Sequence, residues 1–488
     1  MSTVLEQARA AEEPVPGEEN TKRRRIGPAS LIIFLVLVAA FVAPTQPTAD
    51  PDTWWHLRTG EVILETGIPS TDPFSWTAEG RQWTAHEWGS QAILAVIDAT
   101  FGPRGLLLLA GLLVGAAFVL LRKTLRLVTD NDWIVAGALV AALCFSTLTW
   151  SIRPHLFSIL FFSLFLWVLV LHRTGQPPRL IWMLVPATAV WVNLHGAFVS
   201  GVLLLWIFGI VGLIERHPRS RQLLAVAIAA TAAGVLNPSG LAIYLHPLHV
   251  ARVSGEIGEW QATGTRDVFG ILFTIFVLSV PALLALTKRK PEYALLGATL
   301  IFAAMGLGAV KNVWMAGIVG AVTLAAGLQA SERIPRSRDA KDRERLLLMG
   351  GQVALSAAAV AFVWLNFAGG SESQLRGESD FPRGAAEALA TMPEGRMINP
   401  YNWGGYLIWK LPDVPVSIDG RNDMYGDDLL RRQFRIEEFK PGTLDLLDRH
   451  DVTYVLSQRD RPIVEGLRHI DGWKVAYQDR LSILFSRE

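Results

Sequence analysis

The sequence has a single cysteine, Cys144, and almost no net charge. One cysteine excludes an intramolecular disulfide and a cysteine-based metal site. The 45 lysine and arginine residues are balanced by 44 aspartate and glutamate residues, so the chain lacks the basic footprint typical of nucleic-acid partners. It also lacks the Gly-x-Ser-x-Gly, Walker and His-Glu-x-x-His motifs. These absences argue against serine hydrolases, P-loop nucleotide enzymes and zinc proteases.

Charged residues are scarce and apolar residues abundant: 18% of the chain is charged, 51% is hydrophobic, and the mean hydropathy is +0.32. This composition is too apolar for a soluble globular domain. Eleven apolar segments approach the length of about 17–20 residues that a membrane-spanning helix needs. They lie near residues 28–44, 103–121, 133–150, 156–171, 180–194, 197–214, 222–236, 269–287, 292–309, 312–329 and 346–366. The sequence therefore predicts a polytopic α-helical membrane protein.

Basic residues alternate along the connections between these segments. Clusters such as "KRRR" (22–25), "RKTLR" (122–126) and "KRK" (288–290) fall in every second connection, which marks the cytoplasmic side. The other connections carry few basic residues, namely Arg58, Arg81, Arg104, Arg153, Arg252, Arg266 and Lys311. The first apolar segment has no small-residue cleavage motif, so we interpret it as an uncleaved anchor. The N-terminus is therefore expected in the cytoplasm, and the protein in the cytoplasmic membrane.

Three regions follow from this topology. We expect residues 1–26 to form a disordered cytoplasmic tail and residues 27–368 to form the membrane module, with a long first outer loop at 45–102. Residues 369–488 are less apolar and long enough for one small extracytoplasmic domain.

Polar residues that are costly to hold at a membrane face gather on the side assigned as outer. Most of the histidines are there, with acids and amides in short motifs. Outside the first loop these residues are Arg153, His155, Asn193, His195, His246, Glu259 and Lys311. This sorting predicts one polar site at the outer face, covered by the first outer loop and the C-terminal domain.

The first outer loop is predicted to contain two surface helices, at about 52–66 and 86–100, and it carries the acids Asp72 and Glu87. Long loops are usually functional or disordered. This loop holds five of the seventeen tryptophans, a composition that argues against disorder. Membrane-interface anchoring and substrate contact are both open for these rings.

The stretch "TADPDTWWHLRTGE" (48–61) begins the first of these helices. Asp50 fits the N-cap, Pro51 the first helical position, and Asp52 complements the helix dipole. Capping does not explain His56, one turn later on the same face, or Arg58 on a side poor in basic groups. A carboxylate held at a helix N-terminus stays ionised, which suits a general base or a metal ligand. Capping and function are therefore compatible.

The C-terminal region alternates short helical and strand patterns from residue 380 onward, which predicts a small α/β domain. The expected strands are 396–400, 414–419 and 452–457, followed by a hairpin at 473–488. In "NPYNWGGYLIW" the paired glycines would allow close approach to a ligand or to the membrane module; a turn packed by its own aromatics is the alternative. "SIDGRNDMYGDD" has the character of a site-forming loop, with plain solvated charge as the alternative.

The layout resembles the GT-C superfamily of membrane glycosyltransferases, polytopic enzymes that take a sugar from a polyprenyl-phosphate carrier at the non-cytoplasmic face. "DPDTWWH" (50–56) is similar to the first-loop motif of the oligosaccharyltransferase catalytic subunit, whose aspartate is catalytic or metal-binding. "NWGGY" (402–406) loosely resembles its Trp-Trp-Asp-Tyr-Gly signature but lacks the acid, so sequon recognition is not implied. Glu256 or Glu259 lies where that family places a glutamate. The first loop also resembles that of bacterial predicted membrane proteins of unassigned substrate.

The resemblance implies inverting transfer of a sugar from a polyprenyl-phosphate donor to an extracytoplasmic glycan, lipid or protein acceptor. Asp50 would act as the base, and Asp52, Asp72 and Glu87 would share the catalytic role. Asp50 and Asp52 offer the oxygen ligands that suit Mg²⁺ or Mn²⁺, and a metal-independent route is equally open. Residues expected to bind the substrate or the carrier phosphate are His56, Arg58, His86, Arg153, His155, Asn193, His195, His246, Glu259, Lys311, Trp403, Tyr406 and Arg421.

Two other classes of function remain open at this stage. A transporter or flippase of lipid-linked sugars would need polar groups at mid-membrane depth, and the spans carry few charges. A non-catalytic envelope assembly protein would use the C-terminal domain for binding alone.

Overall fold

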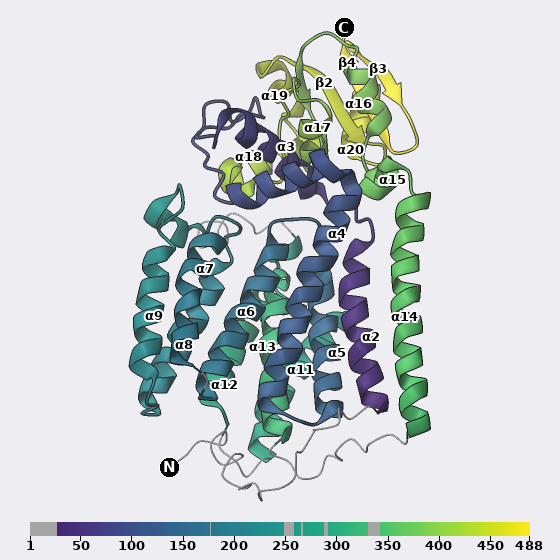
Figure 1. Cartoon of the computed structure of the whole chain (residues 1–488). Coiled ribbons are helices and arrows are strands. Elements are labelled where there is room, and N and C mark those ends of the chain that lie inside the picture. The colour runs from purple at the N-terminus through teal and green to yellow at the C-terminus, as the bar shows by residue number, and fades with distance from the viewer. Residues whose placement is uncertain (1–26, 176, 248–257, 265–266, 287–290, 330–341) are drawn as a thin grey trace, which may run out of the picture.

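The computed structural model describes residues 27–488 apart from 176, 248–257, 265–266, 287–290 and 330–341. Long helices run roughly side by side in one layer, and a second layer of short helices and a small sheet covers one end of them (Figure 1). The second layer is built from the first outer loop and the C-terminal residues (Figure 1). The two regions that lie farthest apart in the sequence therefore form one cap.

The helical layer contains a helix for each of the eleven predicted segments. Seven helices in the described part of the chain are long and apolar enough to cross a membrane, and four more apolar helices are shorter. The elements of this layer are α2 (Pro28–Val42), η1 (Ala43–Thr45), α4 (Trp88–Val128), α5 (Asp132–Ser146), η2 (Thr147–Thr149), α6 (His155–Arg173), η3 (Pro178–Met183), α7 (Leu184–Trp191), α8 (Phe198–Ile214), α9 (Ser220–Ala233), η4 (Gly240–Tyr244), η5 (Gly258–Trp260), α11 (Val268–Leu286), α12 (Tyr293–Gly308), η6 (Val310–Asn312), α13 (Val313–Gln329) and α14 (Asp342–Gly369). The polytopic helical class is confirmed, while the number of spans stays a prediction.

The two predicted surface helices are present. The first is α3 (Pro51–Thr66), with Asp50 as its N-cap and Pro51 at its first position. The second is the initial part of α4, which breaks at Gly102, where the backbone is non-helical at φ 61°. A left-handed backbone favours glycine, and the following Pro103 cannot continue the preceding turn. Beyond this kink α4 runs on as a membrane-length helix (Figure 1).

The C-terminal domain is a small α/β domain, as predicted, around a four-stranded sheet of order β1-β2-β4-β3. Strand β1 is parallel to β2, and the other pairings are antiparallel. Its elements are α15 (Glu372–Arg376), η7 (Glu378–Asp380), α16 (Arg383–Leu389), β1 (Arg396–Ile398), α17 (Tyr401–Lys410), α18 (Asn422–Glu437), α19 (Thr443–Arg449), β2 (Val452–Gln458), α20 (Pro462–Arg468), β3 (Trp473–Gln478) and β4 (Ser482–Arg487).

The strand predicted at 414–419 is wrong. This segment is extended, but its ladder partner is the first outer loop: Ser75 pairs with Val416 in an isolated parallel bridge. The Val416 amide donates to the Phe74 carbonyl (3.0 Å) and the Trp76 amide donates to the Val416 carbonyl (3.1 Å). The apolar pattern was that of a buried extended segment, and a local pattern does not indicate where the hydrogen-bonding partner comes from.

The first outer loop and the C-terminal domain share one hydrophobic core. Trp54 of α3 is buried and packs edge-on against Phe381 and Tyr406, with ring centroids 5.3 and 5.2 Å apart. Gly405 of α17 faces α3 so closely that a Cβ there would lie 2.5 Å from the Pro51 carbonyl oxygen. The C-terminal domain is therefore held directly against the start of α3, where the predicted acids lie.

Candidate functional site

Three carboxylates surround one guanidinium at the boundary between the two layers. Arg153 lies between η2 and α6, and this turn is tied to α3 because the Thr53 hydroxyl donates to the Ile152 carbonyl (2.8 Å). Arg153 Nη2 is 2.6 Å from Asp52 Oδ2. Its Nη1 is 3.5 Å from Asp50 Oδ2 and 3.2 Å from Glu259 Oε2. We call Arg153, Asp50, Asp52 and Glu259 the Arg153 cluster. It unites three segments that were predicted to contribute to one site.

The two aspartates of this cluster differ in protonation. Burial raises the pKa of Asp50, but the Arg153 charge and hydrogen bonds from Ser151 and the Asp52 amide outweigh it, so the net shift is downward. Burial raises the pKa of Asp52 to about 7, with the Asp50 and Glu259 charges adding to the rise and Arg153 opposing it. Asp50 is therefore ionised at neutral pH while Asp52 can exchange a proton. The expectation that capping keeps both residues ionised holds for Asp50 only.

Trp55 and the C-terminal domain enclose Asp52. The Trp55 indole donates to Asp52 Oδ1 (3.1 Å), and a Cβ at Gly420 of the C-terminal domain would lie 1.9 Å from the same oxygen. The Tyr401 hydroxyl donates to Asn422 Oδ1 (2.8 Å). Burial, followed by the Asp52 charge, raises the pKa of Tyr401 well above its usual range.

A second polar cluster is formed by Glu87 and three histidines around it. Its carboxylate is 3.5 Å from His195 Nε2, 3.6 Å from His86 Nε2 and 4.0 Å from His56 Nδ1. Burial lowers the pKa of His56 and of His195 to about 3 each, so both rings are neutral. Burial acts in the same direction on His86, but hydrogen bonding and charge from Glu87 raise the pKa of His86 overall.

The tautomer of His195 follows from its partners. The Trp191 indole donates to Ser158 Oγ (2.8 Å), so the Ser158 hydroxyl proton is available for His195 Nδ1, 2.7 Å away. The Ala197 amide also donates to Nδ1. Nδ1 is thus an acceptor, and Nε2 carries the proton that faces Glu87.

Lys311 extends the Arg153 cluster toward the membrane layer. Its ammonium lies over the Trp260 ring, next in sequence to Glu259. Burial raises the pKa of Glu259, but Arg153 and then Lys311 lower it overall, so this acid is ionised between two cations. His155 bonds the Thr149 carbonyl through its ring and lies beside His195, with centroids 6.3 Å apart.

Asp72 and Arg421 are in a separate buried cluster. Arg421 Nη1 is 2.7 Å from Asp72 Oδ1, its Nη2 is 2.7 Å from Asp419 Oδ2, and the side chains of Arg421, Asp72 and Asp419 are 0% exposed. Phe74, Trp83 and Tyr425 place their rings around the guanidinium. This ion pair joins the first outer loop to the C-terminal domain, so its geometry is that of a structural clamp.

Other predicted binding residues have structural partners. Asn193 accepts from the Trp88 indole (2.6 Å) and donates to the Leu236 carbonyl (2.7 Å). Trp403 and Tyr406 are buried in the shared core. Arg58 pairs with Glu61 at 2.8 Å along α3. Glu256 lies outside the described residues. The roles predicted for these residues stay predictions.

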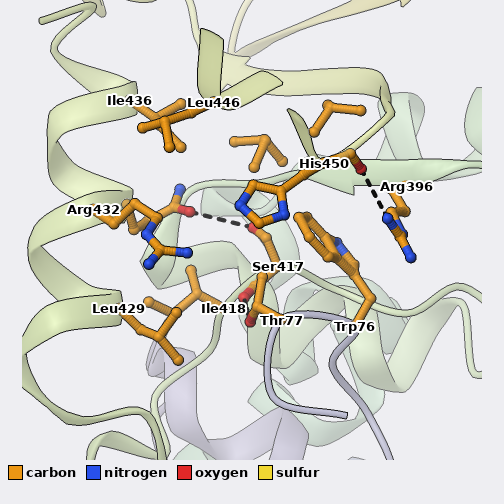
Figure 2. Close-up of a pocket in the computed structure, with 13 residues that line it drawn as sticks. Trp76, Thr77, Arg396, Ser417, Ile418, Leu429, Arg432, Ile436, Leu446 and His450 are labelled. Atoms are coloured by element: carbon orange, nitrogen blue, oxygen red, sulfur yellow. Dashed lines mark hydrogen bonds between the residues drawn. The ribbon is translucent and has the colours of Figure 1, made fainter. Parts of the chain in front are cut away.

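A pocket of about 160 Å³ lies between the first outer loop and the C-terminal domain, away from any predicted catalytic residue. Figure 2 shows the Trp76 ring and the His450 imidazole on one side, and Arg432 opposite. Ser417 forms part of its polar wall, and Arg396 donates to the His450 carbonyl at its edge (3.0 Å).

Several solved structures are similar to this chain, although no protein-family model and no curated protein sequence matches it. The Archaeoglobus fulgidus oligosaccharyltransferase, crystallised with a tethered acceptor peptide containing the NVT sequon, matches 88% of this chain and 68% of its own, with 11% identity and a TM-score of 0.51. The arabinofuranosyltransferase AftD from mycobacteria matches 94% of this chain but only 41% of its own, with 16% identity and a TM-score of 0.50. ArnT from Cupriavidus metallidurans, bound to undecaprenyl phosphate, matches 94% of this chain and 97% of its own at 14% identity, but its TM-score of 0.47 is too low to bear on the fold.

These likenesses show the fold of the chain. As predicted, the chain shares its fold with the oligosaccharyltransferase and with AftD, and it is a multi-pass membrane protein with a C-terminal α/β domain.

Several residues beside the predicted site were missed from the sequence. Gly420 approaches Asp52 from the C-terminal domain, Tyr401 donates to the nearby Asn422, and Asp423 lies near His86. They fall in or next to the two motifs singled out above, "NPYNWGGYLIW" and "SIDGRNDMYGDD". The default interpretation of "SIDGRNDMYGDD" was a solvated charged loop, and only its close approach to α3 in three dimensions distinguishes it from such a loop.

Proposed function

We propose that the chain is a glycosyltransferase that moves a sugar from a polyprenyl-phosphate donor to an acceptor at the outer face of the cytoplasmic membrane, with inversion. The observation that carries this proposal is the Arg153 cluster, a partly buried acidic site between the membrane layer and its cap. The fold supports it, because the oligosaccharyltransferase and AftD, which share this fold with TM-scores of 0.51 and 0.50, are glycosyl-transferring enzymes.

Asp52 is the general base in this proposal. A base works best when its pKa lies near the operating pH, and Asp52 has a pKa of about 7. The acceptor hydroxyl attacks the anomeric carbon, and its proton passes to the Asp52 carboxylate. The bond from the anomeric carbon to the phosphate oxygen breaks, and the lipid phosphate leaves with the electron pair. Asp50 stays ionised and holds Arg153 in place.

Arg153 supplies the positive charge that a divalent metal would otherwise bring to the two aspartates. Their oxygens are the ligand type of Mg²⁺ or Mn²⁺, but the guanidinium already lies 2.6 Å from Asp52 and 3.5 Å from Asp50. We therefore propose a reaction that does not depend on metal at this position. Arg153→Ala should remove transfer, and added Mn²⁺ should not restore it; restoration by Mn²⁺ would show that a metal can take the arginine's place.

The leaving phosphate is assigned to Lys311 and His195, at the membrane side of the cluster. An ammonium and an imidazole N–H can donate charge-assisted hydrogen bonds to phosphate oxygens. Their position beside the outer ends of the helices suits a carrier whose chain lies in the bilayer and whose phosphate lies at its surface.

The decisive experiment uses the purified full chain in lipid nanodiscs with radiolabelled polyprenyl-phosphate sugars and an envelope extract as acceptor. The wild type should consume donor and yield labelled product, Asp52→Asn should lose at least about 100-fold in rate, and Glu65→Gln, an exposed acid of α3, should not. If Asp52→Asn and Asp50→Asn both keep the wild-type rate, the catalytic assignment fails. Flipping of labelled lipid without any transfer would favour a transporter instead.

A further inference from the structure

Two histidines and one aspartate converge from three separate segments near the outer ends of the helices. His86 precedes α4, His246 follows η4, and Asp423 lies in the first turn of α18. One potential ligand atom from each residue lies within 4.8 Å of the other two. The rings of His86 and His246 are 3.9 Å apart at their centroids.

The orientation of the two rings suits a common ligand. Gly196 lies beside both of them, with His86 Nε2 3.7 Å and His246 Cδ2 3.9 Å from the position of a Cβ there. His86 Nε2 and His246 Cδ2, the ring carbon bonded to Nε2, therefore face the same small region. His86 also makes a hydrogen bond to the backbone of Thr84. A second bond of this kind fixes the tautomer and ring orientation of metal-binding histidines.

From this arrangement we infer a divalent transition-metal site of the Zn²⁺ type, formed by His86, His246 and Asp423. Two imidazoles and one carboxylate are a ligand set that Zn²⁺ accepts, whereas Mg²⁺ takes oxygen ligands. The three protein ligands leave a fourth position for water. The Glu87 carboxylate, 3.6 Å from His86 Nε2, can accept a hydrogen bond from that water.

The ion would connect the cap to the membrane module. Asp423 belongs to the C-terminal domain, His86 to the first outer loop, and His246 to a connection of the helical layer. Because such a site is incomplete in the unfolded chain, metal binding stabilises the docked cap. This inference does not rest on the transferase proposal, since neither the Arg153 cluster nor its reaction is needed for the metal to bind.

The test measures the bound metal. The full chain, with its affinity tag removed, is stripped with a chelator in detergent, loaded with Zn²⁺, desalted and assayed by mass spectrometry of the metal. We expect about one retained ion per chain in the wild type, and a fall of roughly tenfold or more in His246→Ala and in Asp423→Asn. His469→Ala, an exposed histidine of the same domain, serves as the matched control and should keep the wild-type content.

Two further measurements keep the inference open to refutation. Co²⁺ in place of Zn²⁺ should give the visible absorption of a low-symmetry site in the wild type, and Zn²⁺ should raise the melting temperature of the wild type but not of Asp423→Asn. Absence of retained metal in the wild type, or equal retention in the wild type and both ligand variants, would overturn the site. These readouts need no sugar donor, so their failure is distinct from failure of the proposed reaction.

Discussion

Gly420→Ala tests whether the position of Asp52 governs the reaction. A Cβ at this glycine would lie 1.9 Å from Asp52 Oδ1 and 3.1 Å from the Trp55 indole nitrogen. Ordinary contact begins at 3.4 Å, so either the carboxylate or the loop that carries residue 420 must move. The carboxylate is the softer of the two, and its movement would stretch the 2.6 Å contact with Arg153 and the 3.1 Å bond from Trp55.

The magnitude follows from these two interactions. Loss of one hydrogen bond between charged groups costs about 1.5–3 kcal/mol, and a displacement of the base by about 1 Å lowers the rate of transfer by about 100-fold. The assay is single-turnover consumption of labelled donor in nanodiscs, with scanning fluorimetry for stability. Gly137→Ala, at a helical position with open space around it, is the control. A Gly420→Ala protein that keeps its cap folded and transfers sugar within about twofold of the wild type would refute the role of Asp52 as base.

Three further predictions concern charge. Because the pKa of Asp52 is raised to about 7, the rate of sugar transfer should rise with pH through about 7, and Asp52→Asn should abolish this pH dependence. An unchanged pH profile in the variant would assign the titration to another group. The same pKa shift means that the native state holds a proton on Asp52 that the unfolded state has released. The free energy of unfolding therefore falls as the pH rises from the unfolded-state pKa of 3.8 through the native pKa of about 7. Scanning fluorimetry should find Asp52→Asn more stable than the wild type at pH 8 but not at pH 4. Arg421→Ala leaves the buried Asp72 unpaired and should cost about 3–5 kcal/mol, visible as protease sensitivity of the cap, whereas the exposed pair of Arg431 and Asp427 should contribute at most about 1 kcal/mol.

The layered helical fold was predictable because length and apolar composition alone specify membrane helices. The surface helix that starts at Asp50 was predictable too, since its cap and first turn are local. The sequence also marked Arg153 and Glu259, because both belong to the polar residues that gather on the side assigned as outer. Their convergence on one guanidinium was not visible, since nothing in the sequence pairs residue 153 with 50, 52 and 259.

The division of the acids into two groups was equally hidden. Asp72 and Asp50 have similar sequence surroundings, because each is an acid of the first outer loop that is directly followed by a proline. Asp72 is nevertheless enclosed with Arg421, 349 residues away, and only that contact distinguishes a clamp from a site. The contribution of the segment that leads into α18 was hidden for the same reason. Its acidic, glycine-containing sequence is indistinguishable from a solvated loop until Gly420 is seen against Asp52.

The shared core of the cap sets an order on biosynthesis. The Trp76 indole bonds the Met397 carbonyl, 321 residues downstream, and the Thr77 hydroxyl bonds the Ser417 carbonyl, 340 residues downstream. At roughly 5–20 residues per second, the first outer loop would wait about 20–70 s after translocation for these partners to be made. During that interval its tryptophans have no core to enter. A nascent chain stalled before the C-terminal domain should therefore expose a tryptophan-rich loop, a natural substrate for chaperones and proteases.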